Sequence, residues 1–196
     1  TGLSETSDGD AWVVKIQPNG GLMWAKTFGG ADTDTAWDIV RTPDGNYLIA
    51  GWTESFGHPV SNGWLVKITP EGDELWNRTY GDSATAEVFR EVTITDRNNI
   101  LATGTSNNTG GEGDDAFITK AAPDGRPMWA FTYGGEGDEH GFAIEQLRAD
   151  EYIVAGRNYD VDDHQWDAWA FAIDRDGQFV WSAVYGHPLL DDVFSD

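Results

Sequence analysis

Short apolar runs alternate with clusters of turn residues along the whole chain. The first four runs span Trp12–Ile16, Met23–Phe28, Ala36–Thr42 and Tyr47–Thr53, and Pro, Asn, Asp or Gly residues lie between them. Each run is rich in β-branched and aromatic residues, which favour strands, and each is too short for an ordinary helix. The pattern therefore predicts an all-β fold.

The same four runs recur along the chain at a fixed period. The spacing of the tryptophan in the second run is 52, 53 and 52 residues, and the first aromatic of the first run keeps the same spacing. The tryptophans are Trp24, Trp76, Trp129 and Trp181, and the first aromatics are Trp12, Trp64, Phe117 and Trp169. We predict one domain of four repeat units, at about 11–62, 63–115, 116–167, and 168–196 together with 1–10.

Alternation within the first run indicates burial on both sides. Trp12, Val14 and Ile16 share one face of the predicted strand, and the opposite face carries Ala11 and Val13. Apolar residues on both faces are typical of a sheet that lies between other sheets. Four-stranded antiparallel sheets repeated at this period are the blades of a β-propeller, so a β-propeller of about four blades is the predicted fold.

The sequence leaves the closure of the ring open. The chain begins within a fourth run at Thr1 and stops within a third run. A closed four-bladed ring, an arc of a larger ring, and two arcs that pair into one ring all fit this arrangement. Open sheet edges with apolar faces attract partners, so the two arc arrangements predict self-association.

The turn-and-tryptophan pattern resembles the β-propeller repeats of secreted bacterial and archaeal surface proteins. The stretches that carry the likeness are "PNGGLMWAKTFGG", "PEGDELWNRTYGD" and "PDGRPMWAFTYGG". The resemblance implies an extracellular or cell-surface location. The element is also similar to the tryptophan motif of quinoprotein dehydrogenases and to the Asp box of sialidases. The hydroxyl position of that box holds Gln17, Thr69, Ala122 and Asp174, so only Thr69 keeps the hydroxyl.

A residue that recurs in every unit is first of all a packing residue. We therefore expect Trp24, Trp76, Trp129 and Trp181 to pack between neighbouring blades, each after a hairpin turn. No nucleophile motif is present, and nothing in the repeat requires catalysis.

Charge narrows the possible partners. The chain carries 34 Asp and Glu against 12 Lys and Arg, a net charge of −22, and has no Cys. Such a surface repels nucleic acid and anionic membranes, and no apolar run is long enough for membrane insertion. The composition is like that of halophilic proteins, with an ordinary acidic secreted protein as the alternative.

One acidic loop has the composition of a Ca²⁺ site. Asp160, Asp162, Asp163 and Asp167 are closely spaced, and carboxylate oxygens are the ligands that Ca²⁺ prefers. The spacing is not that of an EF-hand. We favour a solvated acidic loop as the interpretation and keep weak Ca²⁺ binding as a hypothesis.

Aromatic residues that break the repeat are the candidate ligand contacts. They are Trp37, Trp52, Tyr159 and Trp166, with local packing as the competing interpretation. We predict a non-catalytic module that acts as a scaffold or binds a protein or carbohydrate ligand. The alternatives are a propeller enzyme that acts on glycans or resembles a quinone-dependent dehydrogenase, and a self-assembling structural subunit.

Overall fold

The computed structural model describes residues 9–107, 113–162 and 164–186, and every regular element in this part of the chain is a strand. This confirms the predicted all-β fold. Within these residues no helix is long and apolar enough to cross a membrane. The strands are β1 (Ala11–Ile16), β2 (Leu22–Phe28), β3 (Asp34–Arg41), β4 (Tyr47–Thr53), β5 (Asn62–Ile68), β6 (Glu74–Tyr80), β7 (Ala86–Ile94), β8 (Ile100–Asn107), β9 (Asp114–Ala121), β10 (Pro127–Tyr133), β11 (Glu139–Arg148), β12 (Glu151–Asp160), β13 (Gln165–Asp174) and β14 (Phe179–Tyr185).

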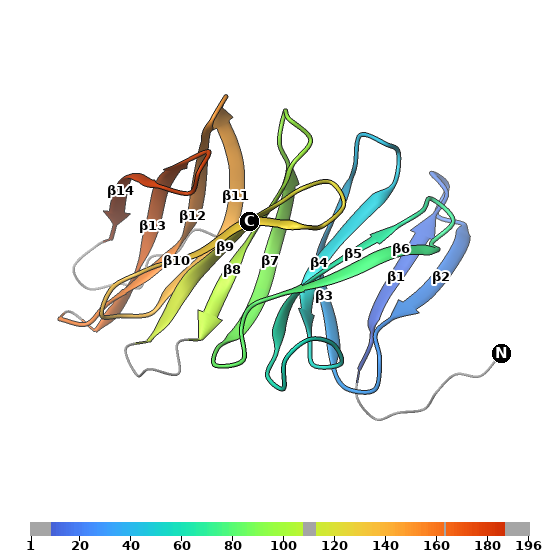
Figure 1. The fold of residues 1–196 in the computed structure, drawn as a ribbon, viewed down its shortest axis with the longest axis horizontal. Helices are drawn as coiled ribbons and strands as arrows, with labels where there is room; N and C mark the ends of the chain where they lie inside the picture. The colour runs from blue at the N-terminus through green and yellow to red at the C-terminus, as the bar shows by residue number, and fades with distance from the viewer. Residues whose placement is uncertain (1–8, 108–112, 163, 187–196) are drawn as a thin grey trace.

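The strands form four antiparallel sheets in chain order. β1 and β2 make a two-stranded sheet, and β3–β6, β7–β10 and β11–β14 make three four-stranded sheets. Each four-stranded sheet joins the third and fourth runs of one repeat to the first and second runs of the next. Figure 1 shows the sheets side by side, with β1–β2 and β14 at opposite ends of the row. The described residues do not form a closed ring.

Apolar cores fill the spaces between successive sheets. Leu48 and Leu65 of one sheet pack in a cluster with Phe89 and Phe117 of the next. Every residue of β5 is buried, so a first-run strand inside the row is covered on both faces. The prediction of burial on both faces is wrong for β1, where Trp12 and Ile16 are exposed. The first strands of successive sheets also contact one another, β3 with β7 and β7 with β11.

A repeated joint connects each sheet to the next. The Nε1–H of Trp24 donates to the carbonyl oxygen of Pro70 (3.1 Å), and the Nζ of Lys15 donates to the same oxygen (2.6 Å). The same pair of hydrogen bonds recurs between the last two sheets, where Trp129 and Lys120 both donate to the carbonyl oxygen of Arg175 (3.1 and 2.8 Å).

Glycine makes this joint fit closely. The turn between the first two runs has a glycine with positive φ, and the ring of the preceding repeat's tryptophan lies against it. A Cβ on Gly125 would lie 2.9 Å from the Trp76 ring, and one on Gly72 would lie 3.1 Å from the Trp24 ring. The repeat tryptophans Trp24, Trp76 and Trp129 therefore pack between sheets as predicted, and the turn glycine lets them approach the backbone. Trp181, for which the same packing was predicted, is exposed and contacts no turn glycine among the described residues.

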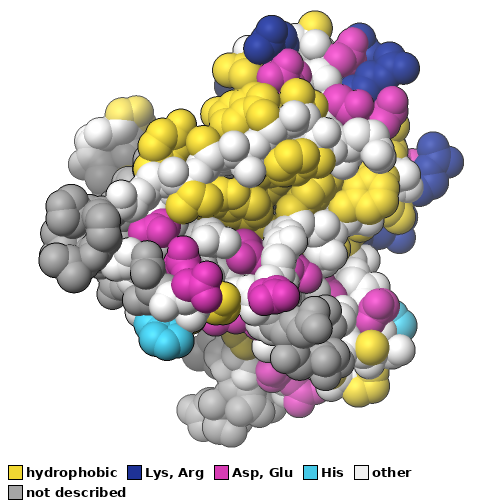
Figure 2. Space-filling model, turned by 90° about the vertical axis from the view of Figure 1, so that its left-hand side faces the viewer, with side chains coloured by type: hydrophobic (Ala, Val, Ile, Leu, Met, Phe, Trp, Pro, Cys, Tyr) yellow, Lys and Arg dark blue, Asp and Glu magenta, His cyan; other side chains and the backbone are white. Residues whose placement is uncertain are grey.

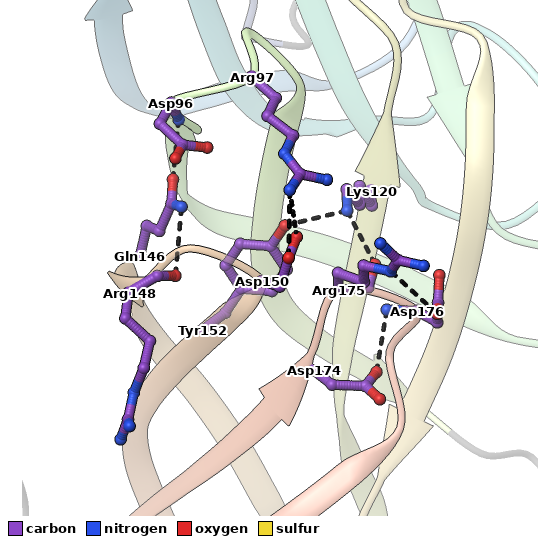
Figure 3. A network of polar contacts seen from close by, with 10 residues as sticks. All are labelled: Asp96, Arg97, Lys120, Gln146, Arg148, Asp150, Tyr152, Asp174, Arg175 and Asp176. Atoms are coloured by element: carbon purple, nitrogen blue, oxygen red, sulfur yellow. Dashed lines mark hydrogen bonds and ion pairs between the residues drawn. The ribbon is translucent and has the colours of Figure 1, made fainter.

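Polar contacts also connect hairpin turns of the last two sheets, as Figure 3 shows. Arg97 of the β7–β8 turn pairs with Asp150 of the β11–β12 turn at 2.9 Å. Lys120 reaches the hydroxyl of Tyr152 as well as the carbonyl of Arg175. The exposed pair contributes little alone, whereas Lys120 is buried and fully engaged.

Replacing Trp129 by alanine is expected to lower the free energy of unfolding by about 2–4 kcal/mol, because the change removes packing and a hydrogen bond at a joint. Urea unfolding measures the change through the midpoint at constant slope. The neighbouring Met128, which is exposed on the same strand, is the matched control. Met128→Ala is expected to shift stability by no more than about 0.5 kcal/mol. Equal losses in the two variants would show that Trp129 is not a joint residue.

Candidate functional site

The first strand of each four-stranded sheet has a bulge at the same repeat position. The strand register shifts at Trp37, between Ala36 and Asp38. Equivalent register shifts occur at Arg90 and at Phe142. The glycine opposite the bulge leaves no room for a side chain, since a Cβ on Gly51 would lie 1.8 Å from the carbonyl oxygen of Thr35. The bulges set Trp37, Arg90 and Phe142 apart from the regular alternation of their strands.

Two arginines lie on aromatic rings, Arg90 on a ring of the neighbouring sheet and Arg157 on rings of its own sheet. The guanidinium carbon of Arg90 lies 4.5 Å from the ring centre of Trp37, which belongs to the preceding sheet. The guanidinium carbon of Arg157 lies 3.7 Å from the ring centre of Trp166 and 5.6 Å from that of Phe142. A stacked guanidinium still has N–H groups at its edge for a planar anion. We call Trp37, Arg90, Phe142, Arg157 and Trp166 the arginine–aromatic cluster.

His140 at the start of β11 extends this cluster. Its Nδ1 accepts from Arg157 Nε (3.2 Å), so the proton of the neutral ring lies on Nε2, which faces a carboxylate oxygen of Asp114 at 3.5 Å. Burial lowers the pKa of His140, and the positive charge of Arg157 lowers it further. The imidazole is therefore neutral near pH 7.

The charge balance at the cluster is unusual for so acidic a chain. Among the described residues, neither Arg90 nor Arg157 has a carboxylate within ion-pair distance, and the Nε of Arg90 is buried without a hydrogen-bond partner. Burial lowers the pKa of Arg90, and the charge of Arg157 lowers it as well, so the two cations repel each other.

Two acidic side chains beside the bulges accept hydrogen bonds from backbone amides. A carboxylate oxygen of Asp38 accepts from the amide of Val92 at 2.9 Å. In the next sheet, Glu91 accepts from the amide of Ile144 at 2.5 Å. These bonds hold β3 to β7 and β7 to β11, and they fix the relative position of the bulges.

A hollow lies elsewhere, between β10 and β14. Its volume is about 620 Å³, and its lining includes Glu139, Tyr159 and Asp160. Glu139 is buried, which raises its pKa, and it accepts from Asn158 Nδ2 (2.6 Å) and the Gly135 amide (2.7 Å). Buried carboxylates stand at the same repeat position in the two preceding sheets, Asp34 and Glu87. A carboxylate that recurs in this way has a structural role.

Three of the four predicted ligand contacts lie at or beside the cluster. Trp37 and Trp166 carry the two arginines, and Tyr159 meets Trp166 edge-on with ring centres 5.2 Å apart. Trp52 lies on β4 opposite Thr35 and Gly63, and it is not part of the arginine–aromatic cluster.

The predicted calcium ligands are only partly described. Asp160 ends β12, and its carboxylate accepts from the amide of Asp162 at 2.8 Å, whereas Asp167 is buried on β13 opposite Asn158. Asp163 lies outside the described residues. The described residues contain no group of three acidic, histidine or cysteine side chains that could hold a metal ion. Ca²⁺ binding by this loop remains a prediction.

Sequence reasoning missed Arg90, Arg157 and His140. A signal existed, because Arg90 stands at the repeat position of Trp37 and Phe142, and Arg157 stands at that of Trp52. Comparing residue types at each repeat position would have revealed both replacements.

Comparison with known proteins gives no family. No protein-family model matches the chain, and no curated protein matches it. Among solved structures, the chain is similar to one titled as the crystal structure of the eukaryotic initiation factor, with 10% sequence identity and a TM-score of 0.46. That alignment covers 89% of this chain and 42% of the other. So weak a similarity supports neither a fold nor a function.

Replacing Arg157 by glutamine is expected to raise the pKa of His140 towards its ordinary value of about 6.5, because a positive charge and a hydrogen bond to Nδ1 are both lost. In the parent chain the folded-state pKa is lowered, so the folded protein binds fewer protons than the unfolded chain as pH falls through about 6.5, and this residue then disfavours folding. The Arg157→Gln variant should lose less stability over that range.

An NMR titration of the histidine ring protons measures the pKa directly. Arg97→Gln is the control, because Arg97 forms an ion pair with Asp150 between two hairpin turns. This variant should leave the His140 titration unchanged. An unaltered His140 pKa in Arg157→Gln would refute the described contact.

Proposed function

We propose that this chain is a non-catalytic, extracellular or cell-surface β-propeller module that binds a carboxylate-bearing ligand at the arginine–aromatic cluster. The observation that carries the proposal is the pair of mutually repelling arginines, Arg90 and Arg157, which have no carboxylate counter-charge among the described residues. Holding two like charges together costs free energy, and an anion between them offsets that cost.

A propeller arrangement of these sheets would favour a ligand at this place. Propeller sheets surround a central channel, and β3, β7 and β11, the first strands that contact one another, would line it. The cluster is built from these strands together with β12 and β13. A site shared by several sheets suits a ligand that enters along the channel.

An acidic saccharide fits the side chains best. Trp37 is 53% exposed although Arg90 lies on it, so ring surface remains for contact with a sugar. Tyr159 and Trp166 add aromatic surface beside Arg157. The N–H edge of a stacked arginine matches the planar carboxylate of a uronic acid.

The acidic surface sets the conditions for binding. A net charge of −22 repels an anionic ligand at long range, whereas contacts at the partly buried arginines act at short range. Salt screens the first effect more than the second, so binding should survive, or improve, in high salt.

A glycan-cleaving enzyme is the second candidate. Glu139 and Asp160 both line the hollow between β10 and β14, and burial raises the pKa of Glu139. Glycosidases use a pair of carboxyl groups, of which the general acid has a raised pKa. The recurrence of a buried acid at this position in other sheets favours the binding module instead.

Titration with trigalacturonate in high salt is expected to give a saturable one-site isotherm by calorimetry. Arg90→Gln and Arg157→Gln should each weaken binding about tenfold or more, because each removes a charge-assisted hydrogen bond. Arg148→Gln is the matched control, because that exposed arginine pairs with Glu151 across the β11–β12 turn.

The uncharged methyl ester of the same saccharide separates the carboxylate from the sugar ring and should bind far more weakly. Tight binding of a glutamate-rich peptide, with no binding of the saccharide, would reassign the ligand to a protein. Equal binding by the parent chain and both arginine variants would end the proposal.

A further inference from the structure

The two ends of the row of sheets display opposite halves of the same joint. Inside the chain, each tryptophan of the second run packs against the turn glycine of the next repeat. At the first end, the turn containing Gly20 has no tryptophan against it, and a Cβ there would meet nothing within 4 Å. At the other end, Trp181 is 37% exposed, and no further turn follows it among the described residues.

The first end also leaves uncovered a face that is buried everywhere else. Trp12 is 68% exposed, whereas its repeat counterpart Trp64 is 1% exposed. Ile16 is 60% exposed, whereas its counterpart Ile68 is fully buried. Within the described residues, the same residue types in the same strand are therefore buried where a sheet packs on them and exposed on β1.

The last sheet has an apolar surface at its outer end. Besides Trp181, β14 exposes Phe179, Val180 and Val184. Figure 2 views the molecule from this side and shows hydrophobic side chains gathered across the middle of the face. Lys and Arg lie at one end of this view, and Asp and Glu lie below the hydrophobic band.

We propose that a second copy of this chain docks head to tail, with the β14 end of one copy packing on the β1 end of the other. Trp181 of one copy would lie on the Gly20 turn of its partner, as Trp76 lies on Gly125 within one chain. The indole Nε1–H would donate to a turn carbonyl, as it does from Trp24 to Pro70.

A second copy is the occupant that the structure favours, because the complementary surface is present on the chain itself. The internal joints already show that these side chains and turns fit each other. The two surfaces differ, so the contact is heterologous and leads to a closed ring or an open fibre. High salt should strengthen it by screening the repulsion between two chains of charge −22.

Complementation between two blocked variants tests the geometry. Trp181→Glu blocks one end and Trp12→Glu blocks the other, and each should weaken self-association about tenfold or more in sedimentation velocity. Each variant keeps the surface that the other has lost. An equimolar mixture is therefore expected to form a discrete heterodimer although neither variant associates alone.

Leu75→Glu is the matched control, because Leu75 is 50% exposed on β6 inside the row and should leave association unchanged. Urea midpoints check that each variant is folded, and Ile16→Glu replaces Trp12→Glu if that variant is not. A parent chain that stays monomeric in high salt overturns the proposal. A mixture that fails to associate also overturns it, because the intact β14 end of one variant would then not bind the intact β1 end of the other. A single variant that still associates alone would show that like ends meet.

Discussion

The packing of a tryptophan ring on the glycine turn of the following repeat is the interaction on which the rest of the structure depends. A sheet whose strands are apolar on both faces is not stable in water alone, so its free energy of folding comes from the neighbouring sheets. The joint sets the spacing and order of those sheets, because the turn glycine allows only one close approach of the ring. Hydrogen bonds such as Trp24 to Pro70 and Trp129 to Arg175 then fix the position along the strands.

The candidate site is a consequence of that spacing. Trp37 and Arg90 lie in neighbouring sheets, so their contact crosses a sheet boundary, whereas Arg157 lies on rings of its own sheet. The backbone bonds of Asp38 and Glu91 hold the first strands together where the bulges project. A regular array thus acquires a specific site where a few positions depart from the repeat.

Electrostatics then separates this site from the remainder of the surface. Acidic residues outnumber basic ones almost threefold, and several lysines and arginines are engaged with carboxylates or carbonyls. Arg90 and Arg157 instead stack on aromatic rings and face each other's charge. This arrangement is the physical basis of the proposed anion site.

The all-β class and the repeated antiparallel sheets were predictable from the sequence, and the site was only partly so. The period of the tryptophans predicted the strands, the two-sided burial of β5 and the packing role of Trp76. Repeat spacing alone does not say where a sheet begins, because any starting point in a cyclic pattern gives the same period. The sheets in fact start at the third run. Aromatic residues that break the repeat pointed to Trp37, Tyr159 and Trp166, whereas Arg90 and Arg157 become neighbours only through bulges and sheet packing that no local pattern encodes.

A crystal structure of the chain grown with a uronic acid tests the central claim most directly. The account predicts a carboxylate held between the N–H edges of Arg90 and Arg157, with the Trp37 and Trp166 rings still stacked on them. Two arginines that instead pair with carboxylates of the chain itself, and leave the acid unbound, would contradict it.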